Sequence, residues 1–376
     1  MNPGDITIGI LGGGQLAKMS AQAGRKMGFN IKVLDPTPNC PASTVAEHII
    51  GSYRDSESII SFASHCDIIT FDIEHAEIAP LKTLENKKKV IPSPRVLEII
   101  QNKLLQRKTL KNVQLPVPEF REITHKEELR ELIPVVQKSI KGGYDGRGTV
   151  IIRNLEDLSK ALDEPSFVEE FLDLEKELGV IVARNEKGDI AVYEVVEMVF
   201  HPEGNLLDYL FCPASISEDV RKEAKELAIE AVRALDGVGL FGVELFLDKK
   251  GKLYINEIAP RPHNSGHHTI EACYTSQFEQ HIRVVTGLPL GATTLMKPCA
   301  MFNLLGEEGY TGKPIYEGLE KVLAIPGVSL HVYGKAKTYP LRKMGHVTIV
   351  GDTLNEVLAK MRKAKAWLKV KGEERI

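Results

Sequence analysis

The first seventy residues alternate between short apolar runs and helical patterns, and this alternation limits the fold more than any other feature of the chain. Residues 6–11, 31–34 and 68–71 are apolar runs of strand length, whereas residues 16–27 and 55–64 have helical spacing. Strands that alternate with helices favour βαβ connections and a parallel sheet. We therefore expect an α/β domain at the N-terminal end.

The rest of the sequence divides into two further regions. A pair of prolines at residues 92–94 marks a boundary, and the pattern after it predicts one helix at 96–111. Residues 134–260 favour strands and hairpins, interrupted by a helix at 218–235, and later strands lead into an amphipathic helix at 354–368. The chain is thus predicted to contain three domains, at residues 1–94, 95–298 and 299–376.

The charge balance narrows the classes of partner. Of 376 residues, 48 are Lys or Arg and 51 are Asp or Glu, so the net charge is −3. This balance provides no general attraction to nucleic acid or to an anionic membrane, and we expect neither partner. No apolar run approaches the roughly 18 residues of a membrane span, and no signal-peptide pattern precedes the first strand. We expect a cytoplasmic protein.

The five cysteines are scattered and form no C-x-x-C pair. An odd, dispersed set is typical of reduced thiols and argues against a disulfide framework or a zinc site. Three histidines do lie together in residues 263–268, but that segment contains no cysteine and no acidic residue. We therefore expect no zinc at this segment.

A glycine-rich turn, GGGQLA at residues 12–17, opens the first helix. It fits the dinucleotide-binding pattern G-x-G-x-x-A, and Asp35 ends the next strand, where such folds place a ribose-binding acid. Amides at a helix start also suit an anion. Three interpretations stay open here: a dinucleotide site, a site for a substrate phosphate, and glycines needed only for tight packing.

The segment KGGYDGRG at residues 141–148 lies between two strand patterns. Its four glycines let the backbone approach a phosphate closely, and Lys138 just before it can supply a point charge. A flexible surface turn would need one or two glycines. A lid that closes over phosphates and excludes water explains the segment better.

Residues 241–258 have the pattern of a β-hairpin with two acidic side chains. If the turn holds an even number of residues, 248 pairs with 253, 246 faces 255, and Glu244 faces Glu257. Like charges in such a pair are destabilising unless neutralised, and carboxylates near phosphates suit Mg²⁺. An odd turn would break this register, and a solvated acidic pair is the alternative.

The loop after this hairpin, residues 259–268, is rich in polar side chains. Arg261 suits charge neutralisation at a transferring phosphoryl group. His263, Asn264 and Ser265 suit substrate contacts, and a helix cap near Ser265 is compatible with that role.

A basic cluster lies near the carboxyl end of the chain. Lys335, Arg342 and Lys343 gather around residues 333–344 of a chain that is otherwise slightly acidic. Cations in such a cluster suit a phosphate group, and a solvated basic face fits the spacing as well.

Together these motifs resemble the N5-carboxyaminoimidazole ribonucleotide synthetase family of the ATP-grasp superfamily. The resemblance covers essentially the whole chain and rests on IGILGGGQLAKM, VLDP, GGYDGRG, FGVELF, YINEIAPRPHNSGHHTIEAC and HVYGKAKTYPLRKMGH. It implies an ATP-grasp fold of the α/β class (α+β overall). Its parts would be an N-terminal Rossmann-like preATP-grasp domain, a central lid subdomain at about residues 116–185 and a small C-terminal β-rich domain.

The resemblance implies an ATP-dependent carbon–nitrogen ligase of purine biosynthesis. ATP would phosphorylate bicarbonate to carboxyphosphate, and the exocyclic amine of aminoimidazole ribonucleotide would take the carboxyl group, leaving ADP and phosphate. The implied cofactors are ATP and a pair of Mg²⁺ ions, and the expected assembly is a homodimer. Phosphoryl transfer needs positioning and charge neutralisation more than a protein nucleophile, which agrees with the motifs found.

The resemblance also assigns individual residues. The ATP site would comprise Lys103, Lys138, Gly143, Tyr144, Asp145, Gly146, Arg147, Gly148, Thr149, Glu169, Glu170, Phe171, Leu172, Glu177, His201, Asn256 and Glu257. The substrate site would comprise Gly14, Gln15, Leu16, Asp35, Glu74, Tyr144, Asp145, Arg147, Arg261, His263, Asn264, Ser265, Lys335, Arg342 and Lys343. The metal ligands would be Glu244 and Glu257, and the catalytic residues Arg261, Lys138, Tyr144 and Arg147.

Some positions depart from the family pattern. Relatives read D-R-x-x-x-K where this chain reads NKLLQR at residues 102–107, so Lys103 replaces an arginine and bidentate geometry is lost. Relatives often read E-x-E-N where this chain reads DIEH at residues 72–75. Ala259 stands where many other ATP-grasp enzymes place a metal-binding Asn, which favours this family over biotin carboxylase.

Three alternatives remain. Another ATP-grasp ligase, such as formate-dependent glycinamide ribonucleotide transformylase, shares the ATP chemistry, but GGGQL, GGYDGRG and NSGH favour the carboxylating family. A Rossmann dehydrogenase explains the first forty residues and leaves Glu244, Asn256, Glu257 and Arg261 without a role. A non-catalytic nucleotide-binding module does not account for both acidic residues together with Lys138 and Arg261.

Overall fold

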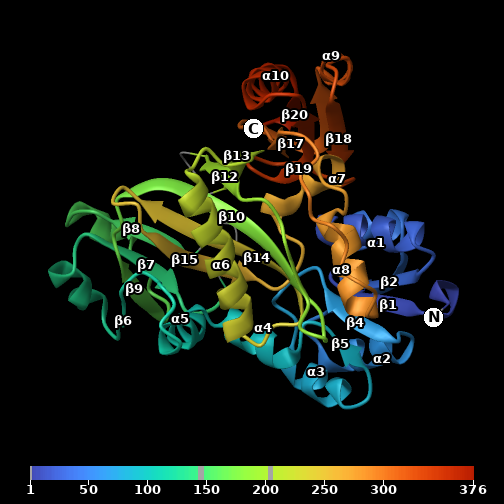
Figure 1. The fold of residues 1–376 in the computed structure, drawn as a ribbon, viewed down its shortest axis with the longest axis horizontal. Coiled ribbons are helices and arrows are strands. Elements are labelled where there is room, and N and C mark those ends of the chain that lie inside the picture. The colour runs from blue at the N-terminus through green and yellow to red at the C-terminus, as the bar shows by residue number, and fades with distance from the viewer. Residues whose placement is uncertain (1, 143–147, 202–205) are drawn as a thin grey trace.

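The computed structural model describes residues 2–142, 148–201 and 206–376. Its N-terminal region is a parallel sheet flanked by helices (Figure 1). The strand order is β3-β2-β1-β4-β5, and every pairing is parallel, as the alternation predicts. The strands are β1 (Thr7–Leu11), β2 (Asn30–Asp35), β3 (Glu47–Ile50), β4 (Ile68–Phe71) and β5 (Lys89–Val90). The helices of this region are η1 (Pro3–Asp5), α1 (Gln15–Lys26), η2 (Pro41–Thr44), α2 (Ser56–Ser64) and α3 (Ile78–Glu85).

Apolar side chains of β1 and β2 fix this sheet against α1. Ile8, Ile10 and Val33 are buried with Ala17 and Ala21 of the helix in one core cluster. In a parallel sheet the carboxyl ends of the strands lie along one edge, where α/β proteins place their ligands. The polar residues that follow β1, β2 and β4 therefore come together at that edge.

The segment predicted as one helix at 96–111 is two helices, α4 (Pro94–Gln101) and α5 (Lys103–Asn112). Asn102 interrupts them with extended backbone angles, φ −116° and ψ 97°, and its side chain accepts a hydrogen bond from the Leu105 amide at 2.9 Å. Asparagine is a favoured N-cap because its side chain satisfies such an amide. The break places Lys103 at the first position of α5.

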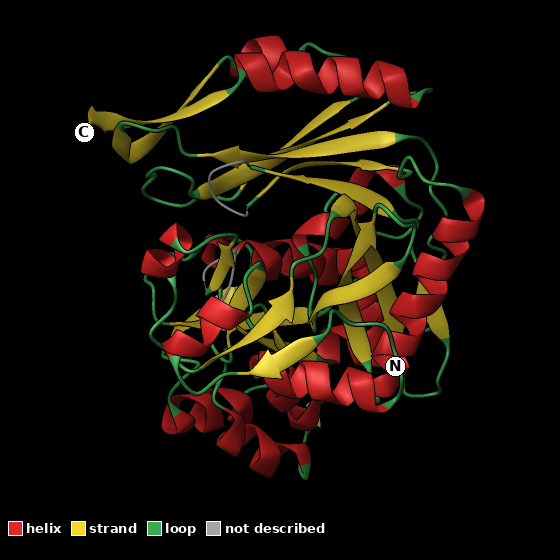
Figure 2. Cartoon of the chain, turned by 90° about the vertical axis from the view of Figure 1, so that its left-hand side faces the viewer, coloured by secondary structure: helices red, strands yellow, loops and turns green. Residues whose placement is uncertain are grey.

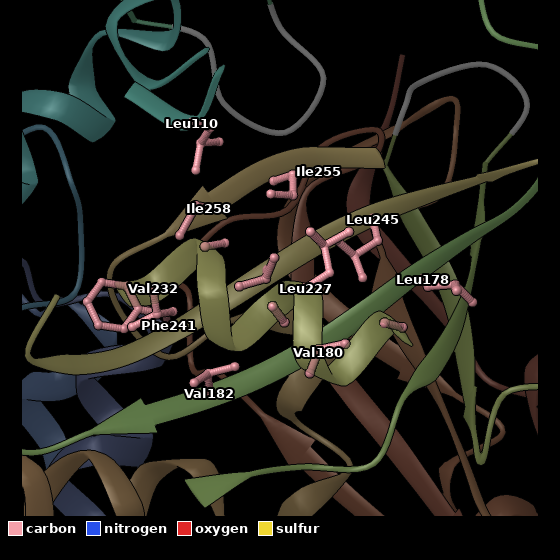
Figure 3. Close-up of a cluster of buried hydrophobic side chains, with 14 of the residues drawn as sticks. Leu110, Leu178, Val180, Val182, Leu227, Val232, Phe241, Leu245, Ile255 and Ile258 are labelled. Atoms are coloured by element: carbon pink, nitrogen blue, oxygen red, sulfur yellow. The ribbon is translucent and has the colours of Figure 1, made fainter. Parts of the chain in front are cut away.

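The central region contains an antiparallel sheet and one end of a larger sheet. The antiparallel sheet has the order β6 (Phe120–Glu122), β9 (Ser166–Glu170), β7 (Val135–Ser139) and β8 (Thr149–Ile152), with η3 (Lys126–Glu131) and η4 (Glu156–Lys160) in its connections. The long helix α6 (Glu218–Ala234) packs Leu227 and Val232 against Val180 and Leu245 of the larger sheet (Figure 3). This apolar layer supports the hairpin that carries the acidic pair.

The larger sheet runs through the central region and into the C-terminal region. Its order is β15 (Leu253–Ala259), β14 (Gly239–Asp248), β10 (Leu174–Arg184), β12 (Val196–Phe200), β13 (Leu207–Cys212), β16 (Cys299–Leu305), β19 (Lys343–Val350) and β18 (Val328–Val332), with β11 (Ile190–Val192) beside β10. The pairing of β13 with β16 carries the sheet across residue 298. The backbone hydrogen bonds of one sheet thus join two of the predicted domains.

The remaining elements cover the C-terminal strands and the loop after the hairpin. Helix α10 (Leu354–Trp367) lies across the C-terminal strands (Figure 2) and buries Val357, Met361 and Ala364 in their core. The others are η5 (Asn264–Gly266), α7 (Thr269–Ala272), α8 (Gln277–Thr286), β17 (Tyr310–Glu317), α9 (Leu319–Leu323) and β20 (Lys369–Arg375). Among the helices of the described ranges, none is both long and apolar enough to cross a membrane.

Candidate active site

A cavity of about 580 Å³ lies between the N-terminal sheet edge, the central antiparallel sheet and the β14–β15 hairpin. Most of the predicted site residues line it: Gln15, Leu16, Glu74, Lys103, Lys138, Thr149, Glu169, Glu170, Phe171, Leu172, Glu177, Glu244, Asn256, Glu257, Arg261, His263, Asn264 and Lys343. Side chains separated by more than 300 residues of sequence thus meet in one space.

Other predicted residues lie elsewhere. Those that are described but do not line the cavity are Gly14, Asp35, Gly148, His201, Ser265, Lys335 and Arg342. Several of them support residues that do: the Ser265 hydroxyl contacts His263 Nδ1 at 2.8 Å, and Lys335 Nζ donates to the Lys343 carbonyl at 2.7 Å. The predicted residues Gly143, Tyr144, Asp145, Gly146 and Arg147 lie outside the described residues.

A protein carboxylate occupies the N-terminus of α1. The amides of Gly14 and Ala17 donate to the two Asp72 oxygens at 2.8 and 2.7 Å, and the Gly13 amide donates to Asp35 at 2.8 Å. A Cβ at Gly14 would lie 2.6 Å from an Asp72 oxygen, so the glycine is required for this close approach. At the Gly14 and Ala17 amides the bound anion in this structure is therefore the protein's own Asp72 carboxylate.

Glu74 and Arg261 form a bidentate ion pair at one end of the cavity. Arg261 Nε lies 2.5 Å from one Glu74 oxygen, and a terminal nitrogen lies 3.0 Å from the other. Burial opposes ionisation of Glu74, but the Arg261 guanidinium outweighs it and lowers the pKa of this carboxyl to about 2. The pair orients the guanidinium, since two parallel hydrogen bonds fix its plane.

Glu169 sits between two cations at the opposite wall. Its carboxylate contacts Lys138 Nζ at 2.7 Å and also binds Arg107, and its side chain is almost fully buried. Burial alone would raise the pKa of Glu169, but Arg107 and Lys138 lower it to about 2. Lys138 Nζ also donates to the Asn256 side-chain oxygen at 2.9 Å, which links this wall to the hairpin.

The hairpin places Glu244 opposite Glu257, but its other strand pairings differ from the predicted ones. Leu247 pairs with Leu253 and Phe246 pairs with Tyr254, so the predicted pairings of 248 with 253 and of 246 with 255 are wrong. The turn between the strands has an odd number of residues, since 248–252 separate Leu247 from Leu253, and Asp248 accepts hydrogen bonds from the Lys250 and Lys252 amides within it.

A β-bulge then restores the register. Leu245 pairs with Ile255, and the register shifts by one residue so that Glu244 pairs with Glu257, with Asn256 as the extra residue. Bulges re-aim side chains and are frequent next to active sites. The predicted juxtaposition of the two glutamates is therefore confirmed, although the predicted turn is not.

The carboxylates of this hairpin repel one another. Burial, then Glu257 and Glu177, raise the pKa of Glu244 to about 8, and burial raises the pKa of Glu177 to about 7. Burial also acts on Glu257, but Lys103, with its Nζ 3.1 Å away, and Lys138 lower the pKa of that carboxyl. The site therefore holds more acidic groups than its cations neutralise.

The donors at the hairpin are oxygen atoms. Asn256 Nδ2 donates to Glu244 at 3.2 Å, while His263 Nε2 lies 3.5 Å from the other Glu244 oxygen. Burial, together with Arg261, lowers the pKa of His263 to about 4, so this ring is neutral near pH 7 and does not balance Glu244. Paired carboxylates beside an amide oxygen fit a hard cation such as Mg²⁺.

His263 also shapes the loop after the hairpin. Its side chain, rather than that of Ser265, caps the short helix η5 by accepting a hydrogen bond from the Ser265 amide. The expected cap near Ser265 is therefore supplied two residues earlier. This cap directs Asn264 toward the cavity and toward Asn303 of β16, with which it exchanges side-chain hydrogen bonds at 3.0 and 2.7 Å.

Several cavity residues were not predicted for the site. Tyr53 and Arg54 follow β3, His75 follows β4, Phe246 lies on β14, and His267 follows η5. Strand β3 was missed because its sequence EHII is short and half polar, and with it the loop that carries Arg54. The signal that could have found this loop is its position after a strand, at the carboxyl edge of the parallel sheet.

Three family models match successive parts of the chain. They are the ribonucleotide synthetase preATP-grasp domain at residues 6–101, the ATP-grasp domain at 108–278 and the phosphoribosylaminoimidazole carboxylase C-terminal domain at 299–360. The fold and the site thus define an ATP-grasp enzyme. The dinucleotide-binding interpretation of residues 12–17 is wrong.

Individual relatives narrow this class. The N5-carboxyaminoimidazole ribonucleotide synthetase structure from Thermotoga maritima is 52% identical, with a TM-score of 0.92, and the match covers 98% of this chain and 100% of that one. The Aspergillus clavatus enzyme, solved in complex with ADP and 5-aminoimidazole ribonucleotide, is 32% identical, with a TM-score of 0.88 and coverage of 96% and 98%. The chain belongs to the N5-carboxyaminoimidazole ribonucleotide synthetase family.

Longer relatives also match. The chloroplastic phosphoribosylaminoimidazole carboxylase of Vigna aconitifolia is 40% identical in an alignment of 370 positions that covers 94% of this chain. The chain spans only 65% of that relative's length. It therefore corresponds to one portion of the longer carboxylases.

Proposed function

We propose that this chain catalyses the ATP-dependent carboxylation of 5-aminoimidazole ribonucleotide. Bicarbonate oxygen attacks the γ-phosphorus of ATP, and the bond to ADP breaks, which gives carboxyphosphate. The exocyclic amine then forms a C–N bond to the carboxyl carbon, phosphate leaves, and the amine loses a proton. The observation that carries the proposal is the single cavity that contains Lys138, the Glu244–Glu257 pair and Arg261.

The nucleotide end of the cavity is assigned to the central sheet. Glu169, Glu170, Phe171 and Leu172 form one wall, and Lys138 lies beside them with its amine toward Asn256. A buried lysine supplies a compact positive charge to phosphate oxygens. Glu177 suits a ribose hydroxyl, because a carboxyl group with a pKa near 7 can donate or accept a hydrogen bond.

Glu244, Glu257 and the oxygen of Asn256 would hold Mg²⁺ beside those phosphates. Burial and the neighbouring Glu257 and Glu177 raise the pKa of Glu244 against the opposing effect of Lys103 and Lys138, which supports a cation at this position. The ion would neutralise phosphate charge during transfer. Lys103 would add its own charge at the edge of the same group, since it already contacts Glu257.

The substrate end lies between the first turn of α1 and the loop after the hairpin. Gln15 and Leu16 line the cavity together with Arg261, His263 and Asn264. Arg261, held in plane by Glu74, would neutralise the oxygens of carboxyphosphate. Lys343 would add a second cation, for the ribonucleotide phosphate. We assign Tyr144, Asp145 and Arg147 to a lid over the site.

The proposal includes the larger organisation of the protein. We propose domains at residues 1–94, 95–298 and 299–376, with a lid subdomain at about 116–185. The boundary at 298 lies at the end of the gap between the second and third matched segments, whereas the boundary at 94 lies seven residues before the end of the first. A homodimer and a cytoplasmic location belong to the same proposal. Light scattering coupled to gel filtration measures the assembly directly.

Phosphate release tests the reaction. With ATP and 5-aminoimidazole ribonucleotide we expect release that depends on added bicarbonate, and N5-carboxyaminoimidazole ribonucleotide in the product mixture. The same assay with formate and glycinamide ribonucleotide tests the transformylase alternative. Release that requires formate, with none from bicarbonate, would overturn the proposal.

A further inference from the structure

Two cysteines and a histidine that are far apart in the sequence meet behind the active-site loop. Cys212 ends β13, Cys299 begins β16 directly opposite it, and His268 follows η5. One donor atom from each of these three residues lies within 4.8 Å of the other two, and each residue is at most 1% exposed. Cys212 and Cys299 are 56 and 31 residues from His268 in the sequence, and the fold brings both to it.

The ring of His268 is fixed with one nitrogen available. Nδ1 lies 3.0 Å from the Ser265 carbonyl oxygen, which only accepts, so Nδ1 carries the proton and Nε2 holds a lone pair. Nε2 is buried beside the Cys212 thiol: burial is the main effect on the pKa of that thiol and raises it, whereas the contact with His268 lowers it. Metal-binding histidines usually donate their second N–H to a carbonyl in this way.

The surroundings of the two thiols are apolar. Met198, Leu210 and Met301 pack around them in one buried cluster, and Cys212 Sγ has a weak contact with the Val195 carbonyl at 3.8 Å. Burial raises the pKa of the Cys212 thiol well above its usual value. A bare thiolate is therefore disfavoured here, and a cation that neutralises it would be strongly coupled to its ionisation.

Charge selects the ion. Two thiolates, a neutral imidazole and a divalent cation sum to zero, which an apolar core tolerates, whereas a monovalent cation leaves a net charge of about −1. Sulfur donors exclude Mg²⁺ and suit Zn²⁺. Zinc bonds of about 2.3 Å to sulfur and 2.0–2.1 Å to nitrogen put such donors roughly 3.5–3.8 Å apart, so a contraction of at most about 1.3 Å from the 4.8 Å limit closes the group.

We propose that Cys212, Cys299 and His268 form a structural zinc site. Cys273, five residues after His268, is a further buried thiol but is not part of this group. The site would join the matched ATP-grasp segment, which contains Cys212 and His268, to the matched C-terminal segment, which begins at Cys299.

The position of the site defines its effect. His267, the neighbour of His268, lines the cavity, and Asn264 binds Asn303 of the strand that Cys299 begins. A zinc ion behind these residues would hold the loop at 263–268 against β16. Zinc that binds only the folded arrangement of these side chains adds its binding free energy to the stability, so we expect bound zinc to raise the melting temperature.

The test uses the full chain, produced in zinc-supplemented medium, reduced and freed of loosely bound metal. We expect one zinc per chain by elemental analysis, and a thiolate-to-cobalt charge-transfer band after refolding with Co²⁺. The band is specific, because the Glu244–Glu257 group has only oxygen donors. Cys212→Ser, Cys299→Ser and His268→Asn should lose the zinc and most of the rise in melting temperature. Cys66→Ser, which changes a buried thiol of the N-terminal sheet, should keep both.

Circular dichroism establishes that each variant is folded before its metal content is compared. Folded wild-type protein that carries no zinc and gives no cobalt band would overturn the proposal. A cobalt band that persists in both cysteine variants would also overturn it, as would a Cys212–Cys299 disulfide in freshly prepared protein, seen by mass spectrometry. None of these readouts depends on carboxylation.

Discussion

The two ends of the active-site cavity carry buried carboxylates in opposite states. At the loop end, Glu74 is paired with Arg261 and its pKa falls to about 2. At the hairpin end, Glu244 faces Glu257, and its pKa rises to about 8. Burial acts in the same direction on both, so the partner decides the charge. At the loop end the carboxylate has a cationic partner, whereas at the hairpin end Glu244 faces a second acid, where we propose that Mg²⁺ binds.

The strongest test removes the charge that the cation would need. Glu257→Gln should lower the kcat of ATP turnover by at least about 100-fold, because the proposed metal loses one of its two carboxylates. The measurement is ADP release at saturating ATP, with circular dichroism to establish folding. Glu175→Gln, at an exposed position of β10, is the matched control. Unchanged turnover in Glu257→Gln would refute the metal role.

A second substitution disrupts the Glu74–Arg261 ion pair at the loop end. Arg261→Lys keeps the positive charge but loses the bidentate contact with Glu74, so we expect kcat to fall roughly 10- to 100-fold. The KM for ATP should change little, because ATP is assigned to the other end. Initial rates with each substrate varied in turn separate these effects. An increase confined to the KM for ATP would place Arg261 at the nucleotide instead.

The third test uses pH to compare the ends. In metal-free protein the raised pKa of Glu244 means that the folded state holds a proton which the unfolded state releases near pH 4.3. Stability due to this group therefore falls as the pH rises from about 4.5 to 8. Glu244→Gln should remove the loss and raise the melting temperature at pH 8 by roughly 2–4 °C.

The pH dependence of the stability that Glu74 contributes has the opposite sign. Its depressed pKa contributes stability above about pH 4.5, and this contribution is lost as the pH falls toward 2. Thermal unfolding of Glu244→Gln and Glu74→Gln across this range measures both slopes. Equal pH dependence of the two variants would contradict the contrast between the ends.

The smallest expected effect concerns the departure at Lys103. Lys103→Arg restores the family residue beside Glu257 and offers a planar group to a phosphate, so the KM for ATP should fall about two- to threefold. Isothermal titration with a non-hydrolysable ATP analogue measures the change in affinity. Lys108→Arg, on the exposed face of the same helix, should have no effect.

The sequence predicted what depends on local pattern. The βαβ alternation specified the parallel sheet, and the motifs named most of the residues that line the cavity. It did not predict the break at Asn102, because the helical spacing continues through that residue. It also did not predict the odd turn at Asp248 or the bulge at Asn256. The register shift of the bulge offsets that of the turn, so Glu244 still pairs with Glu257.

Long-range contacts were the least predictable part. The Asp72 carboxylate at the start of α1 is supplied by a strand more than fifty residues away, so the GGGQLA turn alone looks like an anion site. Cys212, His268 and Cys299 likewise meet only because β13 and β16 pair. Neither contact leaves a local signal, and each changes the chemistry assigned to its segment.

The sheet that crosses residue 298 has a practical consequence for dissecting the protein. A chain cut there would separate β16 from β13 and leave a row of unpaired amides and carbonyls on both fragments. Such edges pair with other chains and promote aggregation. The C-terminal segment is therefore a separate unit of sequence but does not fold on its own. We expect the two fragments to stay soluble and folded when they are expressed together, and to aggregate when each is expressed alone.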